Sequence, residues 1–218
     1  MIVDLQKTAT YAYAVWKTDE TSEELLAMLS HKTWYLPFLE KVAKEGRRRE
    51  WLACRVLLKQ LLACETQVYY KESGAPFIAE EGVHISFSHT KGYVAVQVST
   101  AEQPAGIDIE YLSDRVKKIQ NRFVSPDEAQ HISSENEANH LLLHWCAKET
   151  LFKLLDTEAV DFCKHLHLAP FDYALCGSIQ AYETHSTHGK SFTLGYKMTE
   201  AYAMTFCTAY ASSVDLAP

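Results

Sequence analysis

Alternating apolar and polar positions predict strands in the first hundred residues, and apolar residues at steps of three and four predict helices. Strands are predicted at Ala9–Trp16, Val83–Phe87 and Tyr93–Val98, and helices at Ser22–Leu29 and from Pro37 to about Ala63. Ser22 precedes two glutamates and is expected to be the N-cap of the first helix. The last two strands form a hairpin whose polar tip is expected at residues 88–92.

The second half of the chain repeats this order of strands and one long helix. Strands are predicted at Ala105–Glu110, 177–183, 191–198 and 201–210, a short capped helix from Ser125, and a long helix over Glu137–Leu155. The inward stripe of the long helix is expected to contain Leu141, Trp145, Phe152 and Leu155, with Lys148 inside it. A charged side chain in such a stripe requires a partner.

The segment Glu102-Gln103-Pro104 is the predicted boundary between the halves. The fold class is therefore expected to be α+β, with two similar halves, 1–101 and 102–218. Each half is expected to hold a small antiparallel sheet packed on a long helix.

Composition fits a soluble globular protein: of 218 residues, 47% are hydrophobic and 22% are charged. No apolar run approaches a membrane span, and the N-terminus does not resemble a signal peptide. We therefore expect a cytoplasmic protein without membrane contact. The six cysteines include no Cys-x-x-Cys pair, which favours reduced thiols.

Histidines are numerous, but their spacing does not indicate a metal site. His140 and His144 lie four apart on the predicted helix without the glutamate of a metalloprotease helix between them. The interpretation favoured for these two, and for His165, His167, His185 and His188, is a surface position or a hydrogen-bonded core position.

Charge is distributed unevenly along the chain. The net charge of −7 argues against a nucleic-acid partner, and it arises wholly in residues 102–218, with 9 basic and 16 acidic residues. Within the neutral first half, residues 41–59 hold seven basic and two acidic residues. This cluster is either a solvated helix face or an anion site, because guanidinium groups bind phosphate oxygens well.

Two motifs contain carboxylate side chains that could bind a cation or a proton. In Gly106-Ile107-Asp108-Ile109-Glu110, strand alternation directs both carboxylates to one face, where they need solvent, a partner or a cation such as Mg²⁺ or Mn²⁺. The second motif, Trp145-Cys146-Ala147-Lys148-Glu149, is followed by Lys153 one turn after Glu149. A surface Glu149–Lys153 pair is the plainer interpretation, but both charges flank aromatic residues.

In this order, the basic helix, Ser88-His89, G-I-D-I-E and W-x-x-K-E-x-x-x-K together resemble the 4'-phosphopantetheinyl transferases of the larger single-chain type. The motifs cover roughly residues 40–160. The resemblance implies transfer of the 4'-phosphopantetheine group of coenzyme A to a serine of an acyl or peptidyl carrier protein, with release of 3',5'-ADP. The two paired halves suggest a monomer.

The resemblance assigns a role to each motif residue. Asp108, Glu110 and Glu149 would bind Mg²⁺, Glu149 would take the serine proton, and Lys153 would neutralise the leaving phosphate. Ser88 and His89 would contact the 3'-phosphate of coenzyme A, with Arg48 and Arg55 as the favoured helix residues.

The chain departs from the family pattern at one turn. Ala75 replaces the usual lysine of a Gly-Lys-Pro turn, so one phosphate contact is absent unless Lys71 or Lys91 provides it. This departure keeps open a non-catalytic module that binds coenzyme A or a carrier protein. A metal-dependent phosphodiesterase or nuclease is the third alternative, and the net charge opposes it.

The predicted carrier-protein surface follows the G-I-D-I-E motif. Residues 115–123 carry four cations among Val116, Ile119 and Phe123, a composition that suits an acidic amphipathic helix. An exposed basic helix without a partner fits this segment equally well.

Overall fold

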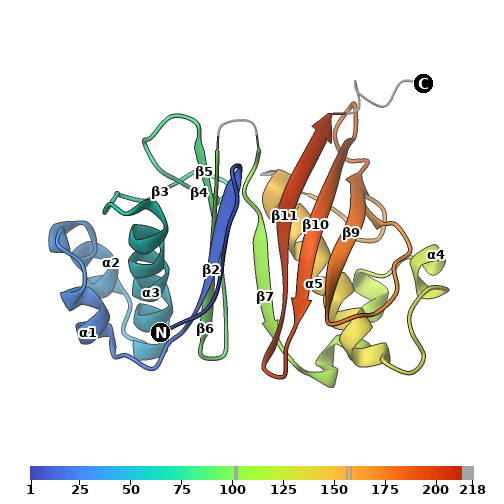
Figure 1. Cartoon of the computed structure of the whole chain (residues 1–218), viewed down its shortest axis with the longest axis horizontal. Helices are drawn as coiled ribbons and strands as arrows, with labels where there is room; N and C mark the ends of the chain where they lie inside the picture. Colours follow the sequence, from blue (N-terminus) through green and yellow to red (C-terminus); the bar gives the residue numbers. More distant parts are fainter. Residues whose placement is uncertain (101–102, 156, 158, 213–218) are drawn as a thin grey trace. The chain divides into compact units, whose positions relative to one another are not determined.

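The computed structural model describes residues 1–100, 103–155, 157 and 159–212, and it divides into two compact units, Met1–Ala105 and Gly106–Pro218 (Figure 1). Part of the predicted boundary segment, Glu102, lies outside the described residues. None of the helices in the described part of the chain has both the length and the apolar composition needed to cross a bilayer.

The N-terminal unit is built on a four-stranded antiparallel sheet. Its elements are β1 (Ile2–Lys7), β2 (Tyr11–Lys17), α1 (Ser22–Ala27), η1 (Lys32–Trp34), α2 (Leu36–Lys41), α3 (Glu45–Leu62), β3 (Tyr69–Tyr70), β4 (Pro76–Phe77), β5 (Val83–Thr90) and β6 (Tyr93–Thr100). The order in the sheet is β1-β2-β6-β5, and β3 and β4 form a separate two-stranded ribbon. Helix α3 packs on β2 and β6, and its buried face forms the core with them.

The prediction of one continuous helix from Pro37 to Ala63 is wrong, because the segment forms two helices, α2 and α3. Val42 has an extended backbone, and Arg48 Nε donates to its carbonyl at 2.5 Å. Glu45 at the start of α3 accepts from the Ser22 amide at 2.8 Å and from its hydroxyl at 2.7 Å. These contacts between distant residues fix the break, which helical periodicity does not reveal.

Two local predictions in this unit are also corrected. The N-cap of α1 is Thr21, which forms a capping box with Glu24, whereas Ser22 is already helical. Strand β5 continues to Thr90, so Ser88 and His89 lie within the strand pair β5–β6, and the hairpin turn falls at Gly92 with φ +74°. The expectation that Ser88 and His89 form the hairpin tip is therefore wrong.

The C-terminal unit holds a five-stranded antiparallel sheet of order β7-β11-β10-β9-β8. Its elements are β7 (Ile107–Tyr111), η2 (Asp114–Lys118), η3 (Gln120–Arg122), α4 (Pro126–Ala129), α5 (Glu137–Leu155), β8 (Leu166–Leu168), β9 (Cys176–Glu183), β10 (Lys190–Met198) and β11 (Tyr202–Ser212). Helix α5 has the predicted bounds and packs on β7 and β11. Both units are mixtures of helices and antiparallel strands, which confirms the α+β class, while the similarity of the halves stays a prediction.

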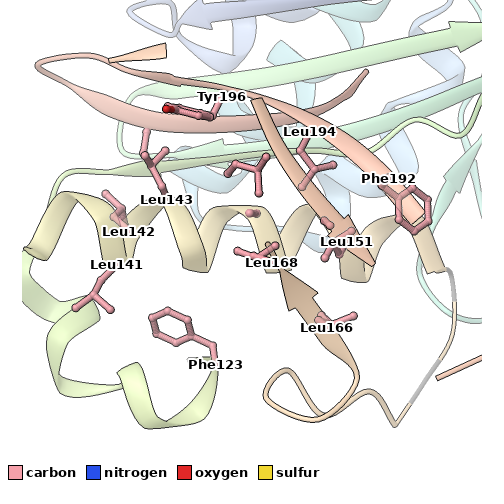
Figure 2. Close-up of a cluster of buried hydrophobic side chains, with 14 of the residues drawn as sticks. Phe123, Leu141, Leu142, Leu143, Leu151, Leu166, Leu168, Phe192, Leu194 and Tyr196 are labelled. Atoms are coloured by element: carbon pink, nitrogen blue, oxygen red, sulfur yellow. The ribbon is translucent and has the colours of Figure 1, made fainter. Parts of the chain in front are cut away.

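Helix α5 is buried on more than one side. Figure 2 shows Leu194 and Tyr196 of the sheet on one side of the helix and Phe123 on the other. The prediction that Phe152 points inward is wrong, because 37% of this residue is exposed. Leu141 of the expected stripe is fully buried as predicted, and Leu143, Ala147 and Leu151 outside this stripe are also fully buried.

Lys148 is fully buried on α5 and has the partner that its position requires. Its Nζ atom lies 2.7 Å from Glu128 Oε2 and donates to the Phe162 carbonyl at 2.9 Å. Glu128 also accepts from the amides of Ser125 at 2.8 Å and Leu168 at 3.0 Å. This buried ion pair joins α4, α5 and β8.

We predict that Lys148→Met lowers the free energy of unfolding by about 3–5 kcal/mol, because Glu128 then remains buried without its counter-ion. Urea unfolding followed by far-UV circular dichroism measures this loss. The double variant Glu128→Gln/Lys148→Met is expected to lose less than the single variant. Equal stability of wild type and Lys148→Met would contradict the assigned pair.

Candidate active site

Strand β7 presents its two carboxylates to helix α5. Asp108 and Glu110 pair with Thr205 and Ala203 of β11, and they alternate with the buried Ile107 and Ile109 as predicted. Asp108 is 4% exposed and Glu110 is half-buried. The strand therefore holds two acidic side chains on one face.

Helix α5 adds three polar groups to this face. Lys153 Nζ lies 2.8 Å from Asp108 Oδ1 and donates to the Ile107 carbonyl at 2.9 Å. The indole of Trp145 donates to Glu110 Oε1 at 2.9 Å. Glu149 lies one turn from each of these residues on α5. Lys153 thus pairs with Asp108 of β7, which argues against the plainer interpretation of a surface pair with Glu149.

The three carboxylates influence one another's protonation. Burial, with the charges of Asp108 and Glu110, raises the pKa of Glu149 to about 7, although Lys153 acts in the opposite direction. Burial and the Asp108 charge also raise the pKa of Glu110. We name Asp108, Glu110, Glu149 and Lys153 the carboxylate cluster; it carries more negative than positive charge.

The chemistry of this donor set fits a hard divalent cation, because carboxylate oxygens are preferred ligands of Mg²⁺ and a cation relieves their repulsion. No three His, Cys, Asp or Glu side chains of the described residues form a ready-made metal site. Asp108 is held by Lys153 and Glu110 by Trp145. Metal binding by the cluster therefore requires its carboxylates to move closer to one another.

The glycine of the first motif has a structural role that sequence reasoning missed. A Cβ atom at Gly106 would lie 2.6 Å from Leu154 Cγ and 3.1 Å from the Thr150 carbonyl of α5. Thr150 in turn shares a 2.6 Å hydrogen bond with Thr205 of β11. Glycine thus permits the close packing that brings the carboxylates of β7 to α5.

Both arginines favoured as phosphate ligands bind protein groups. Arg55 is buried over the Trp51 ring at 3.7 Å and donates to the Tyr70 hydroxyl. Arg48 donates to the carbonyls of Leu39 and Val42 at the end of α2. The phosphate-binding role of these two residues stays a prediction.

Ser88 and His89 lie on opposite faces of β5, with Ser88 buried and His89 exposed. Arg47 Nη1 lies 2.5 Å from His89 Nε2, and Glu50 Oε2 lies 3.4 Å from His89 Nδ1. Sequence reasoning placed Arg47 in the basic cluster but did not select it. Because Arg47 is exposed beside His89 on α3, its guanidinium is more accessible to a phosphate than that of the buried Arg55.

The turn without the usual lysine is closed by backbone hydrogen bonds. The Lys71 amide donates to the Ala75 carbonyl at 3.0 Å, and Gly74 has φ +85°. Lys71 and Lys91 are both exposed. Whether either supplies the missing cation stays a prediction.

The segment predicted to contact the carrier protein is partly buried in the structure. Residues 114–122 form two short 3₁₀ helices, while Val116 and Phe123 are buried in the core of the unit and Ile119 packs against it. These apolar residues are therefore not an exposed contact surface, contrary to the prediction. Arg115, Lys118 and Arg122 remain exposed.

Comparison with known proteins identifies the unit that carries the carboxylate cluster. Residues 104–207 match the family model of the 4'-phosphopantetheinyl transferase superfamily. Residues 104–207 of the chain belong to this superfamily. All four residues of the carboxylate cluster lie within the matched superfamily region, whereas Arg47, Ser88 and His89 lie outside it.

Individual superfamily members are also similar to the chain. It is 31% identical over 113 residues to the 4'-phosphopantetheinyl transferases AcpT of Escherichia coli O157:H7 and Escherichia coli K12, covering 50% of this chain and 57% of each relative. The AcpT of Salmonella typhi is 31% identical over 102 residues, which is 45% of this chain and 53% of the relative. The chain spans about half the length of these curated relatives.

We predict that, without divalent metal, Glu149 makes the folded chain less stable as the pH rises. Its folded pKa of about 7 lies above its ordinary value of 4.5, so between these values the folded state binds the proton more tightly than the unfolded state. The contribution is fully present below about pH 4.5 and is lost as the pH rises through 7.

Thermal melts in EDTA at pH 5, 6, 7 and 8 measure this effect. The Tm of Glu149→Gln relative to wild type is expected to rise with pH, because glutamine carries no charge. The exposed Glu200→Gln serves as the control, with a pH-independent difference. The same pH-independent difference for Glu149→Gln would contradict the assigned pKa.

Proposed function

We propose that the chain transfers the 4'-phosphopantetheine group of coenzyme A to a serine hydroxyl of an apo acyl or peptidyl carrier protein. The observation that carries this proposal is the carboxylate cluster within the region that matches the superfamily. A serine hydroxyl is a poor nucleophile and a pyrophosphate is highly charged, so the reaction needs both a base and positive charge.

Asp108, Glu110 and Glu149 are the residues that would hold Mg²⁺, with Mn²⁺ as an alternative. When bound, the ion supplies positive charge that stabilises the oxygens of the pyrophosphate. Lys153 can then leave Asp108, with which it pairs at 2.8 Å, and neutralise the leaving phosphate. Trp145 keeps Glu110 directed into the cluster through the indole hydrogen bond.

Glu149 is the proposed base. A pKa of about 7 lets its carboxylate accept a proton near neutral pH. The serine oxygen forms a bond to the phosphorus that carries pantetheine, and the bond from this phosphorus to the 3',5'-ADP oxygen breaks. The serine proton passes to Glu149, directly or through water, and 3',5'-ADP leaves with the electron pair of the broken bond.

Coenzyme A phosphates are expected to bind residues of the N-terminal unit. Ser88 and His89 keep the roles that the resemblance implies, and Arg48 and Arg55 remain candidates. We add Arg47, because its exposed guanidinium already contacts His89. Arg47→Gln is expected to raise the KM for coenzyme A several-fold with little change in kcat, and an unchanged KM would remove Arg47 from the site.

The carrier protein is proposed to meet the exposed cations Arg115, Lys118 and Arg122. Since Val116 and Phe123 are buried, the contact would depend on charge and weaken with salt. The enzyme is proposed to act as a monomer.

We predict that the chain with Mg²⁺ and coenzyme A increases the mass of an apo carrier protein by one phosphopantetheine group. Asp108→Asn and Glu149→Gln are each expected to lower the rate by at least about 100-fold, because each removes charge or base at the reacting phosphate. Intact-protein mass spectrometry measures the product. Glu200 is an exposed carboxylate of the same unit, and Glu200→Gln is the matched control, which should keep the wild-type rate.

Failure to modify several carrier proteins that a known transferase modifies would contradict the proposal. Coenzyme A binding without 3',5'-ADP release would instead support the non-catalytic binding module. Undiminished turnover by Asp108→Asn or Glu149→Gln would show that the carboxylate cluster is not the reacting site.

A further inference from the structure

An exposed aromatic surface borders the carboxylate cluster on α5. Phe152 follows Glu149 at a spacing of three residues, which places the two side chains next to each other on the helix. Although Phe152 belongs to a largely buried helix, 37% of it is exposed. Its ring centroid lies 5.8 Å from that of the half-buried Phe162. We name Phe152 and Phe162 the Phe152 patch.

Trp145 connects the Phe152 patch to the carboxylate cluster. The ring centroids of Phe162 and Trp145 lie 5.7 Å apart, and the indole of Trp145 donates to Glu110 Oε1. On its other side, Trp145 meets the edge of the buried Phe123 ring at 5.3 Å. A row of aromatic rings therefore runs from the core of the unit, past the carboxylates, to the surface at Phe152.

The Phe152 patch also adjoins a segment that exposes positive charge. Cys163, which follows Phe162 in the chain, donates through its thiol to the carbonyls of Asn121 at 3.7 Å and Val124 at 3.6 Å. These contacts fix the segment of Phe162 against the end of the two short helices η2 and η3. The exposed cations of η2 and η3 are Arg115, Lys118 and Arg122.

An apolar surface beside exposed cations is complementary to an acidic amphipathic helix. Protein interfaces commonly combine an apolar centre with a polar border, and aromatic rings often anchor the centre. A phosphate group gains nothing from two phenyl rings, whereas an apolar side chain is removed from water by them. The composition of this surface therefore favours a polypeptide over a nucleotide.

We propose that the Phe152 patch binds an apolar side chain on the acidic amphipathic helix of the carrier protein, close to the acceptor serine. This inference rests on the proposed transferase function, in which Glu149 takes the proton of that serine. Because Phe152 lies one helical turn from Glu149, carrier residues next to the serine are brought to Phe152. The patch adds an apolar contact on α5 to the charge contact proposed for residues 115–122.

The affinity for a non-reactive carrier protein tests the Phe152 patch without turnover. The probe is a fluorescent apo carrier protein whose acceptor serine is replaced by alanine, and fluorescence anisotropy gives its Kd for the full chain. Phe152→Ser is expected to raise this Kd about ten-fold, whereas Phe152→Leu keeps an apolar contact and stays within about two-fold of wild type. Leu175 is 68% exposed in the same unit, and Leu175→Ser is the matched control with an unchanged Kd.

Salt and coenzyme A separate the apolar contact from other roles. The ratio of the Kd of Phe152→Ser to that of wild type is expected to be equal in low and high salt, whereas the ratio for Arg122→Gln falls towards one. Calorimetry with coenzyme A is expected to give the same affinity for Phe152→Ser and wild type. Weaker coenzyme A binding with an unchanged carrier Kd would assign the patch to the pantetheine arm and overturn the proposal.

Photo-crosslinking locates the contact even if Phe152→Ser is unstable. Phe152→p-benzoylphenylalanine is expected to crosslink to the carrier helix next to the acceptor serine, and Leu175→p-benzoylphenylalanine to give no crosslink. A crosslink elsewhere on the carrier, an unchanged Kd in a folded Phe152→Ser, or no carrier binding by wild type would overturn the proposal. If the expected crosslink and Kd change occur without release of 3',5'-ADP by wild type acting on a carrier that keeps its serine, the transferase function fails and the carrier contact stands.

Discussion

The close packing of α5 against β7 concentrates charge, and the proposed chemistry depends on this concentration. There is no room for a side chain at Gly106, because Leu154 lies too close. The absence of this side chain lets the strand that carries Asp108 and Glu110 lie against the helix that carries Glu149 and Lys153. One ammonium group cannot neutralise three neighbouring carboxylates. The remaining negative charge must be met by protons or by a cation, and the raised pKa of Glu149 reflects this need.

Two adjacent charged residues of α5, Lys148 and Glu149, differ in whether the fold supplies an opposite charge. Lys148 is fully buried, and its charge is satisfied permanently by Glu128 within the fold. Glu149 is only partly buried and has repelling carboxylates among its neighbours. A group satisfied by the fold contributes to stability, whereas a group left in excess is available for chemistry.

Sequence patterns correctly predicted those features of the fold that depend on residues close together in the chain. Helix α5 has the expected bounds because it is long and periodic, and the carboxylates of β7 share a face because strand side chains alternate. Strand β8 was missed because three residues carry no readable period, and β1 because Val3 and Leu5 are exposed. The pairing of Lys153 with Asp108 joins residues 45 positions apart, and the break before α3 depends on Ser22. Spacing along the chain does not encode contacts of this kind.

The central claim is that the carboxylate cluster holds one divalent cation. Electron paramagnetic resonance of free Mn²⁺, titrated into the full chain at pH 8, counts the bound ions directly. The account predicts one Mn²⁺ per chain, displaced by Mg²⁺, and a loss of this site in both Asp108→Asn and Glu149→Gln. Unchanged Mn²⁺ binding in both variants, or no binding by the wild type, would contradict it.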